Sequence, residues 1–216
     1  MGKKLIILFD LDGTLIDSTD AILESFHHSF KTHGFVHPKD EEIVELIGYP
    51  LDIMFAELGV CKSVVWDFVD TYKNYYRDIS TQKTNLLLNA QEAVQRADEF
   101  ATLGIVTTKT GKYSKVLMEH FDLMKYFKVL IGREDVQKPK PDAQPITKAL
   151  EIIGLDGEEV WMIGDTKLDL ISAQNAGVCS IGVLSGYDNY DILKQHTDVI
   201  FSDALKAVEF LQNKQI

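Results

Sequence analysis

Several features that would mark a specialised protein are scarce in this sequence. Cysteine occurs twice, as Cys61 and Cys179, and two cysteines with no shared spacing provide neither a disulfide framework nor the ligands of a structural zinc. We interpret them as core or surface thiols of a reducing compartment. No apolar run approaches the length that crosses a bilayer, and no repeat or low-complexity tract is visible. We therefore expect a globular protein of the cytoplasm with no membrane partner.

Positive charge is also in short supply. Lys and Arg number 22 against 33 Asp and Glu, which gives a net charge of −11 at pH 7. Such a chain has no general attraction to nucleic acid, whose phosphates it repels. A small phosphorylated metabolite is a more suitable partner, because one metal ion and a few cations can reverse the field locally. The oligomeric state, monomer or dimer, stays open.

Short apolar segments separated by helical patterns make up most of the chain. The apolar segments are typical of strands buried on both faces of a parallel sheet, and they lie at 5–9, 103–107, 128–131, 160–163, 178–183 and 198–201. Helical patterns separate most of them, at 112–121, 142–153, 166–176 and 203–213. This alternation predicts an α/β fold with a doubly wound parallel sheet and right-handed crossovers.

The stretch 17–100 interrupts the alternation. It contains no convincing strand and is expected to form helices near 18–33, 40–47, 51–59, 62–79 and 87–99. A crossover needs one helix, so most of this stretch should form a lobe of its own. We predict an α/β core domain of residues 1–16 and 86–216 and a helical cap domain of residues 17–85. Ligands of open α/β sheets bind at the carboxyl ends of the strands, so we expect a cleft there, beneath the cap.

An acidic pair follows the first apolar segment. Asp10 and Asp12 are two residues apart, so an extended backbone points both carboxylates the same way, and Gly13 permits a sharp turn behind them. Two acids at the carboxyl end of a strand suit either a hard cation or a nucleophile with an acid–base partner. The ordinary alternative is a simple turn, for which Asp, Gly and Thr14 are common residues.

Two further groups follow the next strands. Thr107 ends the second apolar segment with a hydroxyl that can donate to a phosphate oxygen, and Thr108 and Lys109 come directly after it. Farther along, two prolines hold Lys138 and Lys140 in extended conformations, which presents a cation at fixed reach. The ordinary interpretations are a structural threonine and a solvent-facing loop.

The fourth group consists of Asp165 and Asp169. Asp165 follows the segment 160–163 where a helix begins, so it can cap that helix and bind a metal ion. Asp169 lies four residues on, on the same helix face. Taken alone, each is an ordinary helix residue. Carboxylates, a hydroxyl and a lysine at four successive strand ends are a much less ordinary combination, because parallel strands direct these ends to one edge of the sheet.

These residues resemble the four motifs of the haloacid dehalogenase superfamily of phosphohydrolases, over about residues 5–201. The matching segments are, in order, Asp10 to Thr14, Thr107, Lys138, and Gly164 to Asp169. The helical insert has the position of that family's C1-type cap. The Lys138-Pro-x-Pro141 and Asp165-Thr-x-x-Asp169 patterns are most similar to phosphoglycolate-phosphatase-like members.

The resemblance implies a Mg²⁺-dependent phosphatase that works through an aspartyl phosphate. Asp10 would attack phosphorus, and Asp12 would protonate the leaving oxygen and then activate water. Mg²⁺ would be held by the carboxylate of Asp10, the backbone carbonyl of Asp12 and the carboxylate of Asp165, with Asp169 steadying the metal shell or Lys138. A nucleophilic carboxylate needs such cations, because it cannot otherwise approach a dianionic phosphate.

Three neighbours at the second strand end are expected to contact the substrate, Thr107 by the resemblance and Lys109 by its position beside Thr107. Thr107 would bind the phosphoryl oxygens together with Lys138, while Thr108 stands where relatives often carry Asn. Lys109 is placed to meet a second anionic group, as in phosphoglycolate. Two alternatives stay open: a phosphohexose mutase of the same superfamily, and a non-catalytic phosphoacceptor module in which Asp10 is modified.

Overall fold

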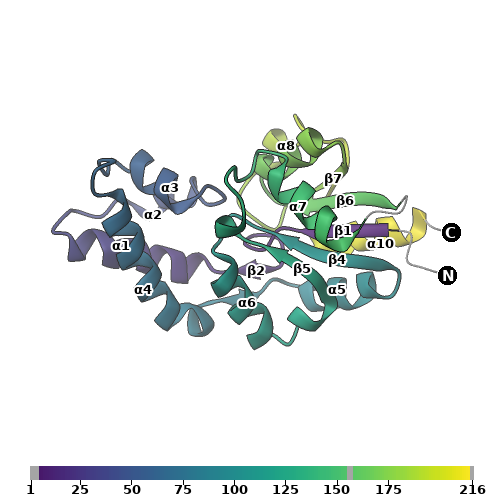
Figure 1. Cartoon of the computed structure of the whole chain (residues 1–216), viewed down its shortest axis with the longest axis horizontal. Helices are drawn as coiled ribbons and strands as arrows, with labels where there is room; N and C mark the ends of the chain where they lie inside the picture. Colours follow the sequence, from purple (N-terminus) through teal and green to yellow (C-terminus); the bar gives the residue numbers. More distant parts are fainter. Residues whose placement is uncertain (1–4, 155–157, 215–216) are drawn as a thin grey trace. The chain divides into compact units, whose positions relative to one another are not determined.

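The computed structural model describes residues 5–154 and 158–214 (Figure 1). The chain forms two compact units: residues 1–17 with 86–216, and residues 18–85. The first unit carries a parallel sheet with helices on both faces, and the second is helical. None of the described helices is long and apolar enough to cross a membrane. Cys61 and Cys179 are both exposed and unbridged.

The sheet of the first unit has six strands, and every pairing in it is parallel. In spatial order they are β5 (Phe127–Ile131), β4 (Ala101–Val106), β1 (Leu5–Phe9), β6 (Glu159–Gly164), β7 (Cys179–Val183) and β8 (Ile200–Phe201). Each strand overlaps an apolar segment that was expected to form one, because a strand covered on both faces needs apolar side chains at every position. The predicted α/β fold class is confirmed.

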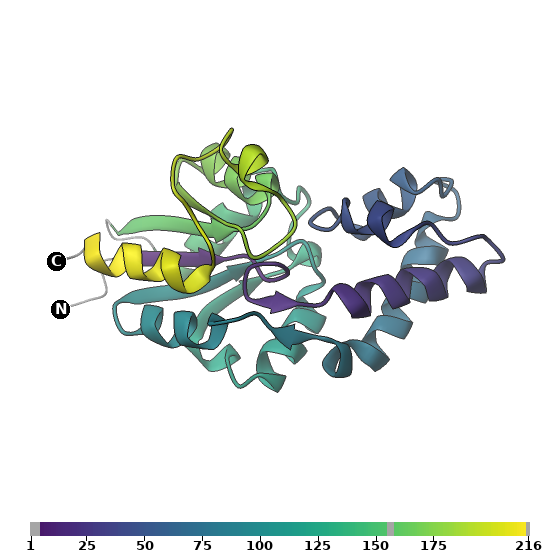
Figure 2. The same ribbon diagram turned by 180° about the vertical axis from the view of Figure 1, so that it is seen from behind.

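The central strand β1 shows how the two faces are filled. Leu5, Ile7 and Phe9 belong to one core cluster with residues of α5 (Ala90–Asp98), α6 (Gly111–His120) and α10 (Ala204–Lys214). Ile6 and Leu8 point the other way, into a cluster with residues of α7 (Gln144–Ile153) and α8 (Lys167–Ala176). Figures 1 and 2 show these helices on opposite sides of the sheet. Alternation along β1 therefore builds both layers of the core.

The position of β1 decides what meets at its carboxyl end. Phe9, its last residue, is in register with Ile105 of β4 on one side and with Ile163 of β6 on the other. The chain reaches β4 first and β6 only later, so the direction of winding reverses beside β1. Such a switch point is where open α/β sheets bind their ligands.

The second unit is built on aromatic packing between helices. Its elements are α1 (Thr19–Thr32), α2 (Asp40–Val44), α3 (Leu51–Glu57) and α4 (Val65–Lys83). Phe26 of α1 lies 4.5 Å from the ring of Phe55 and 5.0 Å from that of Tyr72. The hydroxyl of Ser29 donates to the carbonyl of Phe68 at 2.8 Å and ties α1 to α4.

Five short elements lie outside the predicted set. Strands β2 (Ile16–Asp17) and β3 (Asn85–Leu86) pair with each other, so the prediction of no strand in 17–100 is wrong at β3. Helix α9 (Tyr190–Leu193) and the 3₁₀ turns Met124–Tyr126 and Arg133–Asp135 were also not expected. Elements of two to four residues are too short to show a hydrophobic period.

Candidate active site

A tight turn follows β1 and contains the first acidic pair. The backbone N–H of Asp10 donates to the carbonyl of Ile163 at 2.9 Å and so continues the ladder with β6. Gly13 then takes a φ of 81°, a conformation that glycine adopts without strain. A Cβ atom at Gly13 would also lie only 2.2 Å from Oδ2 of Asp165. The glycine is therefore required both by the turn and by the neighbouring carboxylate.

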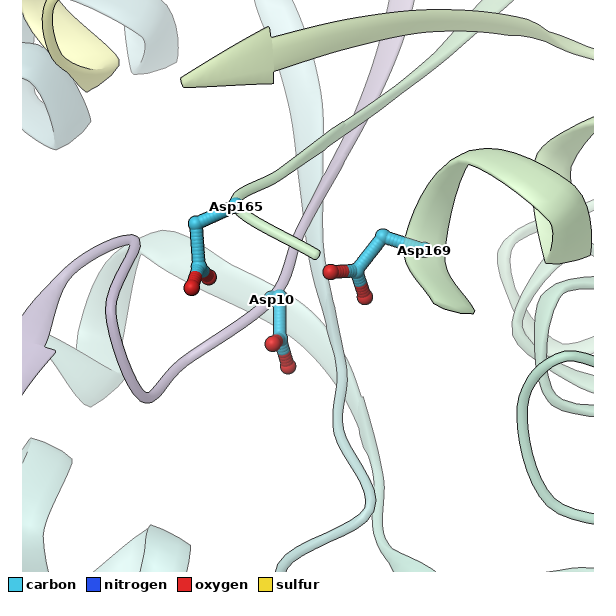
Figure 3. A group of neighbouring side chains, drawn as sticks. All are labelled: Asp10, Asp165 and Asp169. Atoms are coloured by element: carbon cyan, nitrogen blue, oxygen red, sulfur yellow. The ribbon is translucent and has the colours of Figure 1, made fainter. Parts of the chain in front are cut away.

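Three buried carboxylates converge just beyond the sheet. Asp10, Asp165 and Asp169 each offer an oxygen, and these atoms all lie within 4.8 Å of one another. Asp10 follows β1, Asp165 follows β6, and Asp169 lies in the first turn of α8. Figure 3 shows the three side chains gathered at one place from these segments. The structure thus brings together the carboxylates that were predicted as metal ligands.

The cation inside this cluster is Lys140. Its Nζ atom lies 2.8 Å from Oδ1 of Asp10 and also pairs with Oδ1 of Asp169. The same ammonium donates to the backbone carbonyl of Val106 at 3.0 Å, and the side chain is buried. Three carboxylates with one ammonium leave two negative charges uncompensated when all four groups are ionised. A divalent cation would neutralise that charge.

Lys138, the lysine named by the resemblance, is not at the cluster. Its side chain is exposed, and its backbone N–H donates to Oε1 of Gln144 at 2.7 Å. The sequence reads Lys138-Pro-Lys140-Pro, so both lysines precede a proline and both fit the expected pattern. Only the path of the loop distinguishes them, and it turns the second lysine inward. The prediction for Lys138 is therefore corrected to Lys140.

The pKa values reflect the crowding of buried charges. Burial raises the pKa of Asp10 to about 7, and the nearby charge of Asp169 adds to the rise, although Lys140 opposes it. Burial and the charges of Asp10 and Asp169 likewise raise the pKa of Asp165 well above its usual range. Burial disfavours a charged lysine, but Asp10 and Asp169 outweigh it and raise the pKa of Lys140 above its ordinary value.

Both oxygens of Asp165 are held by hydrogen bonds. The hydroxyl of Thr14 donates to Oδ1 at 2.8 Å, and the backbone N–H of Tyr187 donates to Oδ2 at 3.0 Å. The loop Ser185–Asp188, which follows β7, is anchored at both ends: the hydroxyl of Ser185 donates to the carbonyl of Gly13, and the N–H of Asp188 donates to that of Asp165. Sequence reasoning missed this loop, whose only signal is a Ser-Gly-Tyr turn between a strand and a helix.

Asp169 has two separate tasks in the structure. Its Oδ2 accepts hydrogen bonds from the backbone N–H and the hydroxyl of Thr166, at 3.0 and 2.7 Å, at the beginning of α8. Its Oδ1 faces Lys140. Thr166 is the N-cap of α8 and Asp169 completes a capping box with it, so the capping expected of Asp165 is made by other residues. Asp169 also orients Lys140, while the carboxylate of Asp165 belongs to the cluster.

A second ion pair lies beside the cluster. Nζ of Lys109 is 3.0 and 2.8 Å from the two carboxylate oxygens of Asp12, and both side chains are largely buried. Thr107 is buried at the end of β4, where its hydroxyl accepts from the N–H of Lys109 at 3.2 Å. Thr108 is half-buried. The first and second predicted motifs are thus joined directly, through Asp12 and Lys109.

The residues present fit a hard divalent cation. Oxygen atoms of carboxylates and backbone carbonyls are the ligands that Mg²⁺ and Ca²⁺ prefer. Oδ1 of Asp10 is buried and lies 2.8 Å from the ammonium of Lys140. One ammonium does not balance three buried carboxylates, and the remaining buried charge is costly unless a further cation meets it. Cysteine and histidine are absent from the cluster, which argues against a zinc-type donor set.

Comparison with known proteins identifies the family to which this site belongs. The sequence model of the haloacid dehalogenase-like hydrolases matches residues 7–183. The chain is a member of this family. The pyrophosphatase PpaX of Bacillus cereus (strain AH820) is 32% identical over 178 residues, which are 82% of each chain. A protein of Caldanaerobacter subterraneus subsp. tengcongensis, provisionally assigned as pyrophosphatase PpaX, is 34% identical over 213 residues, 97% of this chain and 96% of that one.

The solved structures agree with the family. A haloacid dehalogenase-like hydrolase from Streptococcus pneumoniae has a TM-score of 0.85 at 27% identity, covering 98% of this chain and 100% of the other. The predicted family and the prediction of a hydrolytic enzyme are confirmed. The comparisons also support the coarser part of the functional prediction, a phosphatase of this family with an acidic cluster. A pyrophosphatase, the activity in the names of the two relatives, was not predicted from the sequence.

Proposed function

We propose that the protein is a Mg²⁺-dependent phosphatase that hydrolyses a small phosphorylated compound through an aspartyl phosphate on Asp10. The observation that carries the proposal is the position of Asp10, which lies at the carboxyl end of the central strand between a buried lysine and two further carboxylates. A nucleophile aimed at a phosphate needs this combination of fixed position and positive charge.

The reaction divides between Asp10 and Asp12. A carboxylate oxygen of Asp10 attacks phosphorus while the bond from phosphorus to the leaving oxygen breaks, and Asp12 gives that oxygen its proton. Asp12 then takes a proton from water, whose oxygen attacks the phosphorus of the aspartyl phosphate. Phosphate leaves and Asp10 is restored. Both steps use the same acid–base residue in opposite directions.

The other residues of the cluster provide charge and position. Asp10 and Asp165, with the backbone carbonyl of Asp12, are proposed to hold Mg²⁺, which when bound neutralises charge on the phosphoryl oxygens. Lys140 supplies the second positive charge, and Asp169 holds Lys140 in place. The buried hydroxyl of Thr107, at the neighbouring strand end, is proposed to donate to a phosphoryl oxygen.

Residues 18–85 are proposed to act as a cap, with 17–85 as the domain expected from the sequence. A helical unit inserted after the nucleophile's strand suits the exclusion of water and of large substrates. Such a cap favours a small metabolite over a phosphoprotein or nucleic acid, and the net charge of −11 points the same way.

Two substrates are the leading candidates. The resemblance to phosphoglycolate-phosphatase-like proteins favours phosphoglycolate, which carries a carboxylate beside the phosphate ester. The names of the two relatives favour pyrophosphate, and one of these relatives matches 97% of this chain. Both compounds place a second anionic group close to the scissile bond.

Phosphate release with Mg²⁺ is the test, measured on pyrophosphate, phosphoglycolate and p-nitrophenyl phosphate. We expect repeated turnover by the wild type and none above background by the folded Asp10→Asn variant. A single turnover, with stable phosphate on Asp10, would favour the phosphoacceptor module. Phosphoryl transfer between positions of a hexose phosphate, without release of phosphate, would favour the mutase.

A further inference from the structure

The ion pair between Lys109 and Asp12 places an ammonium directly beside the residue that is proposed as the acid–base group. Nζ of Lys109 contacts both carboxylate oxygens of Asp12, at 3.0 and 2.8 Å. The two side chains are only 10% and 12% exposed, so little water screens the charges. In the function proposed above, on which this inference rests, the leaving oxygen receives its proton from Asp12. Any group attached to that oxygen therefore departs beside an ammonium.

The backbone around Lys109 limits where that ammonium can go. The N–H of Lys109 donates to the hydroxyl of Thr107, and its carbonyl accepts from the N–H of Arg133 at 3.0 Å. Both ends of the peptide are thus attached to the ends of neighbouring strands, β4 and β5. The flexible part of the residue is its four-carbon stem, which lets the ammonium turn toward a bound anion over a short range.

We propose that Lys109 is a specificity-determining residue that selects substrates whose leaving group carries a negative charge close to the scissile bond. Pyrophosphate and phosphoglycolate belong to this class, since their leaving groups are phosphate and glycolate. When such a substrate binds, its second anion meets Lys109, and Asp12 is released from the ion pair to act on the leaving oxygen. A neutral leaving group offers no second anion, so it gains nothing from Lys109.

A competing explanation is that Lys109 only orients Asp12. In that case its removal would slow all substrates by the same factor, because every one of them uses Asp12. A selective role instead changes the ratio between anionic and neutral leaving groups. The ratio therefore separates the two roles without depending on the absolute rate of the variant.

The test compares phosphoglycolate with 2-hydroxyethyl phosphate, which is similar in size but has a neutral leaving group. In Lys109→Met we expect kcat/KM for phosphoglycolate and pyrophosphate to fall about 10- to 100-fold more than for 2-hydroxyethyl phosphate, the range of a hydrogen bond between charged groups. Most of the selective loss should appear in KM for the anionic substrates. The matched control is Lys112→Met, three residues away with an exposed side chain. It should change neither kcat/KM nor KM for any of the three substrates.

Two outcomes would overturn the inference while leaving the proposed function intact. One is an equal loss on all three substrates, which would make Lys109 a positioning residue. The other is an unchanged selectivity ratio in a fully active Lys109→Met. Failure of the proposed function gives a different result, because the wild type would then hydrolyse none of the compounds and Asp10 would take up no phosphate. Thermal melting of both variants checks that they are folded.

Discussion

Gly186 lies so close to Asp165 that a Cβ atom added to the glycine would be 1.9 Å from Oδ2 of the carboxylate. The backbone at Gly186 is not in the left-handed region, so the contact alone demands glycine here. Gly13 approaches the same oxygen from another loop, at 2.2 Å. Asp165 is thus enclosed by two glycines, with one hydrogen-bond donor on each of its oxygens.

From this relationship we predict that Gly186→Ala weakens the binding of Mg²⁺. Alanine must displace Asp165 or the loop, and loss of such outer contacts typically costs about 10- to 100-fold in metal affinity. Titration calorimetry with Mg²⁺, without substrate, measures the change directly. Leu184→Ala is the control, because Leu184 is an exposed residue of the same segment. Equal affinities in Gly186→Ala and wild type would contradict the role given to this loop.

The two lysines of the proline-rich loop should behave very differently. Lys140→Met leaves the carboxylates of Asp10 and Asp169 buried without their cation, which typically costs about 3–5 kcal/mol of stability. We also expect activity to fall at least about 100-fold, as for the loss of one transition-state contact. Lys138→Met should be close to wild type in both respects. Urea unfolding and initial rates test the pair, and the reverse pattern would restore Lys138 to the site.

The metal-free protein should lose stability as the pH rises from about 4 toward 7. Asp10 has a pKa of about 7 when folded and 3.8 ordinarily, so the folded state holds a proton that the unfolded state has released. Deprotonation then favours unfolding, by up to about 1.4 kcal/mol per pH unit. Melting temperatures in EDTA should fall across this window, and less so in Asp10→Asn. At pH 7, adding Mg²⁺ should restore the melting temperature of the wild type but not that of Asp10→Asn. A melting temperature that rises with pH in EDTA would contradict this prediction.

Activity should depend on the choice of divalent metal. EDTA should abolish turnover and Mg²⁺ should restore it, because the two excess negative charges of the cluster need a cation. Ca²⁺ should inhibit, since its larger and looser ligand shell aligns the nucleophile less well. Rates measured in each metal, with the total metal content of the purified protein, decide the matter. Full activity in chelator, or stoichiometric zinc, would refute the assignment.

Much of the core was predictable because a buried parallel strand leaves a simple signature. The run Leu5–Phe9 is apolar at every position, and the structure buries all five residues. Once such runs are ordered in a parallel sheet, Asp10 and Asp165 must emerge at the same edge. Their convergence followed from topology alone, without any knowledge of side-chain contacts.

The missed features depend on the paths of loops. Lys138 and Lys140 have the same local pattern, and only the tertiary course of the chain buries one of them. The loop at Gly186 reads as an ordinary turn, because its role lies in a contact with Asp165, 21 positions earlier in the chain. A sequence pattern does not reveal contacts between residues that lie so far apart in the chain.

The registers of β1 with β4 and β6 affect how the effects of core mutations on activity are interpreted. Side chains alternate along a strand, so a slip of one residue between Phe9 and Ile163 would turn Asp10 to the opposite face of the sheet. The geometry of the reacting groups is therefore maintained by apolar residues that never touch a substrate. A substitution at Leu8 or Ile7 that loosens this alignment would present in an assay as a catalytic defect, and only a structural probe would trace it to the core.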